Sequence, residues 1–232
     1  MTTTAKVPTL DSTGQIPVYV ARPEGKAKAA IIVVPEIFGV NPGIRKKCDD
    51  WAAKGYAAAA PDIFWRFSAG EELNPDIEEE FSKALENMGQ YDADLGVQDI
   101  EALIRWLKDD GGVSKVGLVG FCLGGRMAYL AAARTDIDAS VGYYGVMIDQ
   151  MLGESHAIAN PLMLHIPEED HFVDKAAQVK IHEGLDDHHK VTLHDYPGMD
   201  HGFATESGDR RDEENAQLAD KRTEDFFAES FG

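Results

Sequence analysis

The sequence predicts one α/β domain in which helices flank a mainly parallel central sheet. Short runs rich in β-branched residues alternate with amphipathic segments, the pattern of strands joined by crossover helices. The length of 232 residues suits a single hydrophobic core. No internal repeat, low-complexity tract or flexible linker divides the chain. We therefore expect a single domain over residues 1–232.

The expected strands are short apolar runs that end at turn-forming residues. Residues 29–34 (AAIIVV) are too few and too rich in β-branched side chains for a helix. Residues 56–60 form a second expected strand, which ends at Pro61. The remaining expected strands are residues 115–119, 139–144, 161–166 and 191–196.

Helices are expected between these strands. Residues 42–54 have Pro42 in the first turn and stop before Gly55, as helices commonly do. Residues 68–90 are irregular and acidic, and we expect them to make an excursion over one face of the sheet. The other expected helices are residues 91–108, 122–133, 173–185 and 212–231.

The composition excludes several classes of partner. The chain has 22 basic and 41 acidic residues, a formal charge of −19, which repels nucleic acid and anionic lipid. No apolar run approaches the roughly 20 residues of a membrane helix, and no secretory signal is evident. Two cysteines are too few for a disulfide scaffold and fit a reducing compartment. We expect a cytoplasmic protein, monomeric or alternatively a homodimer.

Residues 115–125 (KVGLVGFCLGG) contain the most informative motif. The order is strand, then G-x-C-x-G, then helix, which is the context of a nucleophile elbow with cysteine as the nucleophile. The close approach of strand and helix leaves no room for side chains at Gly120 and Gly124. The turn lifts Cys122 to the carboxyl edge of the sheet and aims the Leu123 amide outward as an oxyanion donor. Cys48, in the middle of an expected helix, is interpreted as a packing residue.

A nucleophile of this kind needs a histidine base and an acid that orients it, in the chain order nucleophile, acid, histidine. Asp170 comes just after the expected strand 161–166, and His201 just after the strand 191–196. Both therefore lie at the same sheet edge as Cys122. The neighbouring carboxylates that we assign to solvent are Glu168, Glu169 and Asp200.

The other histidines do not show the spacing of a metal site. They lack the i, i+4 pairs and the Cys/His spacing of known ligand sets, so we expect neither a metal nor a cofactor. The histidines near one another in sequence are His182, His188, His189 and His194, and those interpreted as local packing or hydrogen-bonding groups are His165 and His171.

Six segments carry a resemblance that covers nearly the whole chain. They are VPEIFGVN (34–41), GYA…APD (55–62), GFCLGG (120–125), VGYYG (141–145), DHFV (170–173) and G…HGF (198–203). Together they resemble the dienelactone hydrolase family of α/β-hydrolases. The resemblance implies cleavage of an ester or lactone through a thioester acyl-enzyme, with a small molecule as substrate.

The resemblance also implies roles for individual residues. Cys122, Asp170 and His201 match the family's catalytic triad. Glu36 matches a carboxylate that pairs with the resting thiol and is displaced by substrate; a like charge there opposes thiolate formation and limits oxidation. The amide of Ile37 matches the second oxyanion donor. The side chains expected to line the substrate pocket are Phe38, Phe81, Tyr144 and Phe203.

The sequence departs from the family at the positions that bind the carboxylate of the substrate. Well-known members hold a substrate carboxylate with two arginines, and these positions align near Phe81 and Thr205, neither of which is basic. A bidentate arginine clamp is not replaced by an apolar ring. We therefore expect a preference for substrates other than carboxylate-bearing dienelactone. The basic residues that could still fill the role are Arg66, Lys83, Arg210 and Arg211.

Two alternatives stay open. One is a broader carboxylesterase or thioesterase for neutral acyl groups, which a screen of lactones against acyclic esters would identify. The other is a thiol redox sensor or binding protein without turnover, since a fold does not fix a function. Hydrolysis of a generic ester, lost on alkylation of Cys122, would exclude the second.

Overall fold

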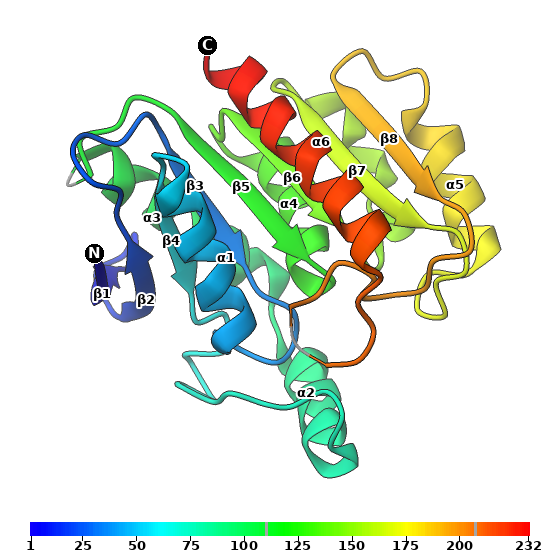
Figure 1. Ribbon diagram of the computed structural model, residues 1–232, viewed down its shortest axis with the longest axis horizontal. Helices are drawn as coiled ribbons and strands as arrows, with labels where there is room; N and C mark the ends of the chain where they lie inside the picture. The colour runs from blue at the N-terminus through cyan, green and yellow to red at the C-terminus, as the bar shows by residue number, and fades with distance from the viewer. Residues whose placement is uncertain (110, 207) are drawn as a thin grey trace.

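The computed structural model describes residues 1–109, 111–206 and 208–232, which form an eight-stranded sheet in the order β1-β2-β4-β3-β5-β6-β7-β8 (Figure 1). Strands β3 to β8 pair in parallel, whereas β1 and β2 are antiparallel. The strands are β1 (Thr2–Pro8), β2 (Gln15–Ala21), β3 (Ala30–Val34), β4 (Ala57–Pro61), β5 (Val116–Phe121), β6 (Ala139–Tyr143), β7 (Leu162–Pro167) and β8 (Val191–Tyr196). The predicted fold class is confirmed.

Helices cover both faces of this sheet. Helices α1 and α6 lie on one face, and α3, α4 and α5 lie on the other (Figure 1). Every residue of β3 and β5 is buried, because a strand covered on both faces has no side open to water. The helices are α1 (Pro42–Ala53), α2 (Glu78–Gln90), α3 (Ala93–Asp109), α4 (Leu123–Arg134), α5 (Lys175–Leu185) and α6 (Glu213–Phe231), with 3-10 turns at Ile148–Gln150 and Leu152–Ala157.

The N-terminal hairpin β1–β2 is an element that the sequence patterns did not predict. Strand β2 does alternate buried and less buried residues, but Pro17 interrupts it, and proline argues against a strand. Strand β1 is mostly exposed, so it lacks an apolar pattern altogether. Both strands form because they extend the sheet beyond β4 as an antiparallel edge.

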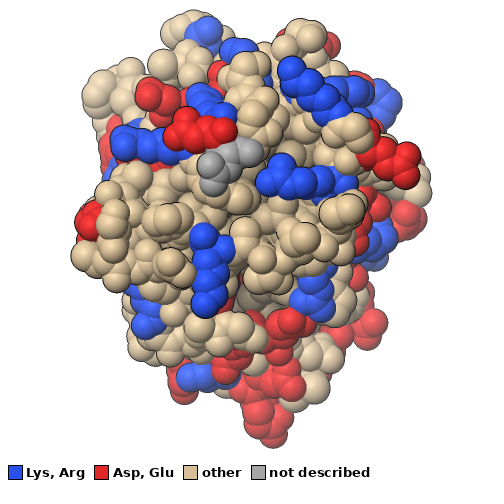
Figure 2. Space-filling view, turned by 90° about the vertical axis from the view of Figure 1, so that its left-hand side faces the viewer, with Lys and Arg blue, Asp and Glu red and all other residues tan. Residues whose placement is uncertain are grey.

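The acidic segment 68–90 does not cover a face of the sheet, which corrects the sequence-based expectation. Its second half is the regular helix α2, which lies beyond the carboxyl edge of the strands (Figure 1). The physical reason is a narrow apolar face: only Ala84 and Asn87 of α2 are fully buried, and its first turn is acidic. Acidic side chains also gather at the lower end of the surface in Figure 2, the level at which α2 lies in Figure 1.

None of the helices in the described ranges combines the length and the apolar character that a transmembrane span requires.

Candidate active site

Cys122 occupies a strained turn between β5 and α4. Its φ of 55° and ψ of −112° lie in a region that residues with side chains rarely adopt. A Cβ on Gly120 would lie 1.9 Å from the carbonyl oxygen of Gly124, and a Cβ on Gly124 would lie 2.3 Å from that of Val34. The structure therefore confirms that this close approach requires both glycines. The turn also sets Cys122 at the N-terminus of α4, where the helix dipole favours negative charge on the sulfur.

Two backbone amides lie beside this turn. The Leu123 amide belongs to the first residue of α4 and so has no partner within the helix. Ile37 follows β3, the strand that pairs with β5, and it lines the same cavity as Cys122. These are the two amides that the sequence analysis singled out as oxyanion donors.

His201 and Asp170 meet on the loops that follow β8 and β7. The Nδ1 atom of His201 lies 2.9 Å from Oδ2 and 3.1 Å from Oδ1 of Asp170. Because a carboxylate only accepts, Nδ1 carries the proton and donates it, which leaves Nε2 as the free ring nitrogen. Asp170 is itself fixed by the amides of Phe172 and Val173, at 2.8 and 3.1 Å. The histidine therefore has one orientation and, in its neutral form, one tautomer.

The free nitrogen of His201 is buried beside Cys122. Asp170 engages Nδ1 and leaves Nε2 available, and His201 and Cys122 line one cavity. Burial by itself lowers the pKa of His201, but the neighbouring Cys122 and the hydrogen-bonded Asp170 outweigh burial and raise this pKa to about 10. The site therefore stabilises the imidazolium that forms once His201 has taken up a proton beside the charged sulfur, and this form can return a proton to a leaving group.

Glu36 is a buried carboxylate on the loop after β3. Its Oε2 atom accepts a hydrogen bond of 3.1 Å from the hydroxyl of Thr205, which lies four residues beyond His201. Tyr144 is fully buried and packs on the ring of His201, with the centroids 4.9 Å apart. Burial, Glu36 and Cys122 raise the pKa of Tyr144 well above its ordinary value. Glu36, Cys122 and Tyr144 are thus electrostatic neighbours.

The cavity above Cys122 is narrow and mostly apolar. Its volume of about 20 Å³ holds about one water molecule. Two of the rim side chains, Leu85 and Phe172, are about 40% exposed. The lining residues are Glu36, Ile37, Phe38, Phe81, Leu85, Met88, Cys122, Val146, Phe172, His201 and Arg210.

The four aromatic residues expected in the pocket divide into two pairs. Phe38 and Phe81 line the cavity and pack on each other, with centroids 5.9 Å apart. Tyr144 and Phe203 are not part of that lining. Phe203 is buried behind Tyr144 and packs on it and on Tyr196, at 5.8 and 4.7 Å. Tyr144 therefore supports the His201 ring, and Phe203 supports Tyr144.

The sequence analysis named four basic residues that could hold a substrate carboxylate. Of these, Arg210 lines the cavity, and its guanidinium lies 5.4 Å from the centroid of the Phe81 ring. The other three face acidic partners elsewhere. Arg66 donates to both oxygens of Asp99, and Arg211 pairs with Glu206 and Glu213. The side chain of Lys83 is 44% exposed and lies 3.9 Å from Glu86.

Asp200, which the sequence analysis assigned to solvent, also makes contacts that this assignment did not include. Its side chain is 57% exposed, yet Oδ1 accepts from the His201 amide at 2.6 Å and from Nδ1 and the amide of His171 at 2.7 and 3.1 Å. Asp200 thereby joins the Asp170 loop to the His201 loop. The sequence held one signal for this contact, because Asp200 directly precedes His201.

Possible metal ligands converge at one place within the described ranges. Ligand atoms of Asp170, His171 and Asp200 lie within 4.8 Å of one another. All three side chains already serve in the hydrogen bonds between the two loops. Of the sequence-adjacent histidines, His182 bonds Asp186 and Asp195, and His188 stacks on His189.

Comparisons with known proteins agree on one family. The model of the "Dienelactone hydrolase family" matches residues 16–231. A protein of Azospirillum brasilense is 38% identical over 229 residues, which cover 94% of this chain and 95% of the relative. The carboxymethylenebutenolidase of Pseudomonas putida is 37% identical over 205 residues, covering 88% and 87%. A crystal structure from Klebsiella pneumoniae superposes with a TM-score of 0.82 at 25% identity, covering 98% and 99%.

The contacts of Asp200 predict a pH-dependent contribution to stability. Burial raises the pKa of Asp200, but the hydrogen bonds from His171 and the His201 amide outweigh burial and lower it. A carboxylate with a lowered pKa stabilises the fold above its unfolded value near 3.9 and loses this contribution as pH falls. Asp200→Asn should therefore lower the free energy of unfolding at pH 7, and the difference from wild type should vanish well below pH 4.

Chemical denaturation at several pH values measures this difference. Glu169→Gln is the control, because Glu169 lies on the Asp170 loop that Asp200 contacts, its side chain is 64% exposed, and its carboxylate lies 3.8 Å from Lys175. Equal stability of Asp200→Asn and wild type at pH 7 would contradict the prediction.

Proposed function

The chain belongs to the dienelactone hydrolase family, whose members hydrolyse ester and lactone bonds, and we propose that it cleaves a small ester or lactone with Cys122 as nucleophile. The observation that supports this most strongly is the shared cavity of Cys122 and His201, in which Asp170 fixes the histidine with Nε2 free. Nucleophile, base and orienting acid are the three parts that nucleophilic catalysis needs.

In the proposed acylation, Nε2 of His201 takes the proton of the Cys122 thiol, and the sulfur attacks the carbonyl carbon. The carbonyl π electrons move to oxygen, where the amides of Leu123 and Ile37 donate to the oxyanion. As the oxyanion collapses, the ester C–O bond breaks and His201 returns its proton to the alkoxide. In a lactone this alkoxide stays attached to the acyl group. The product is a thioester on Cys122.

Deacylation reverses these roles with water. His201 takes a proton from water, and the hydroxide adds to the thioester carbonyl. The C–S bond then breaks, and the sulfur leaves as a thiolate that is reprotonated by His201. Asp170 keeps its proton-accepting bond to Nδ1 throughout and stabilises the imidazolium.

Glu36 is proposed to restrain the thiol while the site is empty. It is a buried carboxylate in the same cavity as Cys122, and a like charge opposes formation of the thiolate. Substrate that enters this narrow cavity displaces Glu36, so the nucleophile is activated only when substrate is present. The resting cysteine is then less open to oxidation.

The walls of the cavity favour a neutral substrate. They are mainly apolar, with Arg210 as the cationic side chain in the lining. The first turn of α2, the helix whose Phe81 lines the cavity, contains Glu78, Glu79 and Glu80, and the whole chain carries −19. A carboxylate-bearing lactone therefore meets a repulsive field and one arginine, in place of the two expected from the family.

Variants of the triad test the mechanism. Cys122→Ala and His201→Ala should each lower kcat/KM for a p-nitrophenyl ester by at least about 10³-fold, and Asp170→Asn by less. The double variant Cys122→Ala/His201→Ala should be no slower than either single variant, because the groups act as a unit. Circular dichroism verifies folding. Wild-type turnover by Cys122→Ala would refute Cys122 as the nucleophile.

Alkylation of the resting enzyme tests Glu36. Glu36→Gln should raise the rate of modification of Cys122 by iodoacetamide at pH 7, since the substitution removes a negative charge beside the sulfur. Mass spectrometry assigns the modified residue; Cys48 is fully buried, and burial raises the pKa of its thiol. An unchanged or slower rate would argue against restraint by Glu36.

Substrate choice is tested with a matched pair of lactones. A neutral lactone should have a higher kcat/KM than dienelactone, and added salt should narrow the gap because it screens the acidic field. Arg210→Gln should lower kcat/KM for dienelactone by about tenfold or more, the value of one charge-assisted hydrogen bond, and should affect the neutral lactone less.

The control for Arg210 is Lys83→Gln, which removes a nearby positive charge that does not line the cavity. A clear preference of the wild type for dienelactone would overturn the proposed substrate class and leave the triad chemistry intact.

A further inference from the structure

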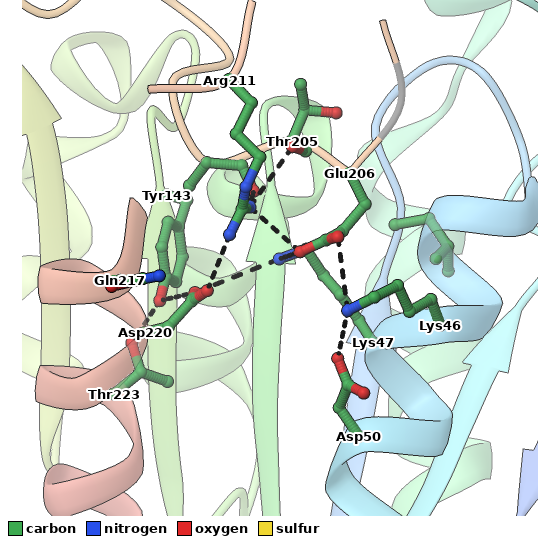
Figure 3. A network of polar contacts seen from close by, with 12 residues as sticks. Lys46, Lys47, Asp50, Tyr143, Thr205, Glu206, Arg211, Gln217, Asp220 and Thr223 are labelled. Atoms are coloured by element: carbon green, nitrogen blue, oxygen red, sulfur yellow. Dashed lines mark hydrogen bonds and ion pairs between the residues drawn. The ribbon is translucent and has the colours of Figure 1, made fainter. Parts of the chain in front are cut away.

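A charged network lies next to the candidate site, outside the residues assigned so far (Figure 3). At its centre, the carboxylate of Glu206 faces three cations: Arg211 at 3.0 Å, Lys46 at 3.4 Å and Lys47 at 3.5 Å. The cations come from helix α1 and from the segment just before α6. Glu206 is the residue directly after Thr205, the hydrogen-bond partner of Glu36.

The network continues from Glu206 into α6 and the sheet. Asp220 of α6 lies 4.0 Å from Lys47 and 3.9 Å from Arg211, and it accepts a 3.0 Å hydrogen bond from the hydroxyl of Tyr143. The Nζ atom of Lys47 also lies 4.7 Å from the centroid of the Phe121 ring. Figure 3 shows these side chains converging from α1, α6 and the loop that carries Thr205.

Three segments of the candidate site therefore meet at this network. Phe121 directly precedes Cys122, Tyr143 directly precedes Tyr144, and Glu206 directly follows Thr205. Arg211 adds hydrogen bonds to the carbonyl oxygens of Ala204 and Thr205, at 3.3 and 3.4 Å. The backbone of Thr205 is thus held through its own carbonyl and through its neighbour.

Burial makes the Lys47–Glu206 pair different from an ordinary surface pair. The side chains of Lys47 and Glu206 are 9% and 13% exposed. An exposed pair contributes little, whereas removal of one partner of a buried pair leaves an uncompensated charge and forces a rearrangement. Loss of the Glu206 charge is therefore expected to shift the Thr205 segment as well as weaken one contact.

We propose that Glu206 is a positioning residue for Glu36: through its three cationic partners it holds the Thr205 hydroxyl against Glu36 and so keeps this carboxylate beside Cys122. The inference rests on the proposed role of Glu36. When the Glu206 charge is lost, Thr205 moves away and Glu36 is no longer held near the sulfur. The resting thiol then becomes more reactive, as it does when Glu36 itself is neutralised.

The experiment is a double-mutant cycle on the rate of Cys122 alkylation by iodoacetamide at pH 7. Glu206→Gln should raise this rate by at least about twofold, the lower end of coupling between residues in contact. In the Glu36→Gln background the same substitution should add nothing, because its effect passes through Glu36. A general loosening of the fold would raise the rate in both backgrounds.

Two further variants make the test specific. Thr205→Val keeps the side-chain shape but removes the donor to Glu36, so it should raise alkylation as Glu206→Gln does even if Glu206→Gln folds poorly. Glu213→Gln is the matched control: Glu213 also pairs with Arg211, at 2.7 Å, but it is 64% exposed and does not adjoin Thr205. Its alkylation rate should equal that of wild type.

The outcomes separate this inference from the proposed function. If Glu36→Gln raises alkylation but Glu206→Gln and Thr205→Val do not, the positioning role is wrong and the role of Glu36 stands. Additive effects of Glu206→Gln and Glu36→Gln also overturn the positioning role. If Glu36→Gln leaves the rate unchanged, both roles fail, while ester hydrolysis by wild type still decides whether Cys122 is the nucleophile.

Discussion

The approach of α4 to the ends of β3 and β5 constrains the rest of the site. A side chain on Gly120 or Gly124 would collide with backbone oxygens, so the chain can make this turn only with glycine at both positions. The geometry of this turn gives Cys122 a positive φ and holds the residue at the carboxyl edge of the sheet. The cost of this strain is offset by the surrounding core, since β3 and β5 are wholly buried. The loops after β7 and β8 reach the same edge because those strands run parallel to β5.

The buried charged groups around this turn have partners, and the cavity walls between them are mainly apolar. Asp170 has His201 and two amides, and Glu36 has Thr205. The Lys47–Glu206 pair lies behind the walls, where low solvent access makes its geometry matter more than at the surface. In the proposed mechanism, the apolar walls leave few dipoles to compete for the substrate carbonyl, and the charges fix the segments that carry the proposed reacting groups.

The central part of the fold could be predicted from the sequence because its signals are local. The β-branched run at 30–34 and the glycine-flanked Cys122 each determine the backbone around them. The hairpin β1–β2 could not, because it forms by pairing with β4 and its own pattern is broken by Pro17. The position of Arg210 could not be predicted either, because nothing in the sequence distinguishes it from Arg211. In the structure Arg210 lines the cavity, whereas Arg211 pairs with Glu206. Asp200 and Glu206 act through contacts between loops, which a single sequence does not reveal.

Thr205 stands where the sequence analysis aligns one of the two arginines of well-known family members. An arginine at this position would hold a substrate carboxylate and would also cancel much of the charge of Glu36. A threonine hydroxyl does neither: it orients Glu36 with one neutral hydrogen bond and leaves the negative charge in place. Under the proposed mechanism, the same residue therefore weakens recognition of anionic substrates and strengthens the restraint on the resting thiol. Because a neutral donor orients less strongly than a cation, Thr205 itself needs external support, and the ion pairs of Glu206 are placed where they supply it.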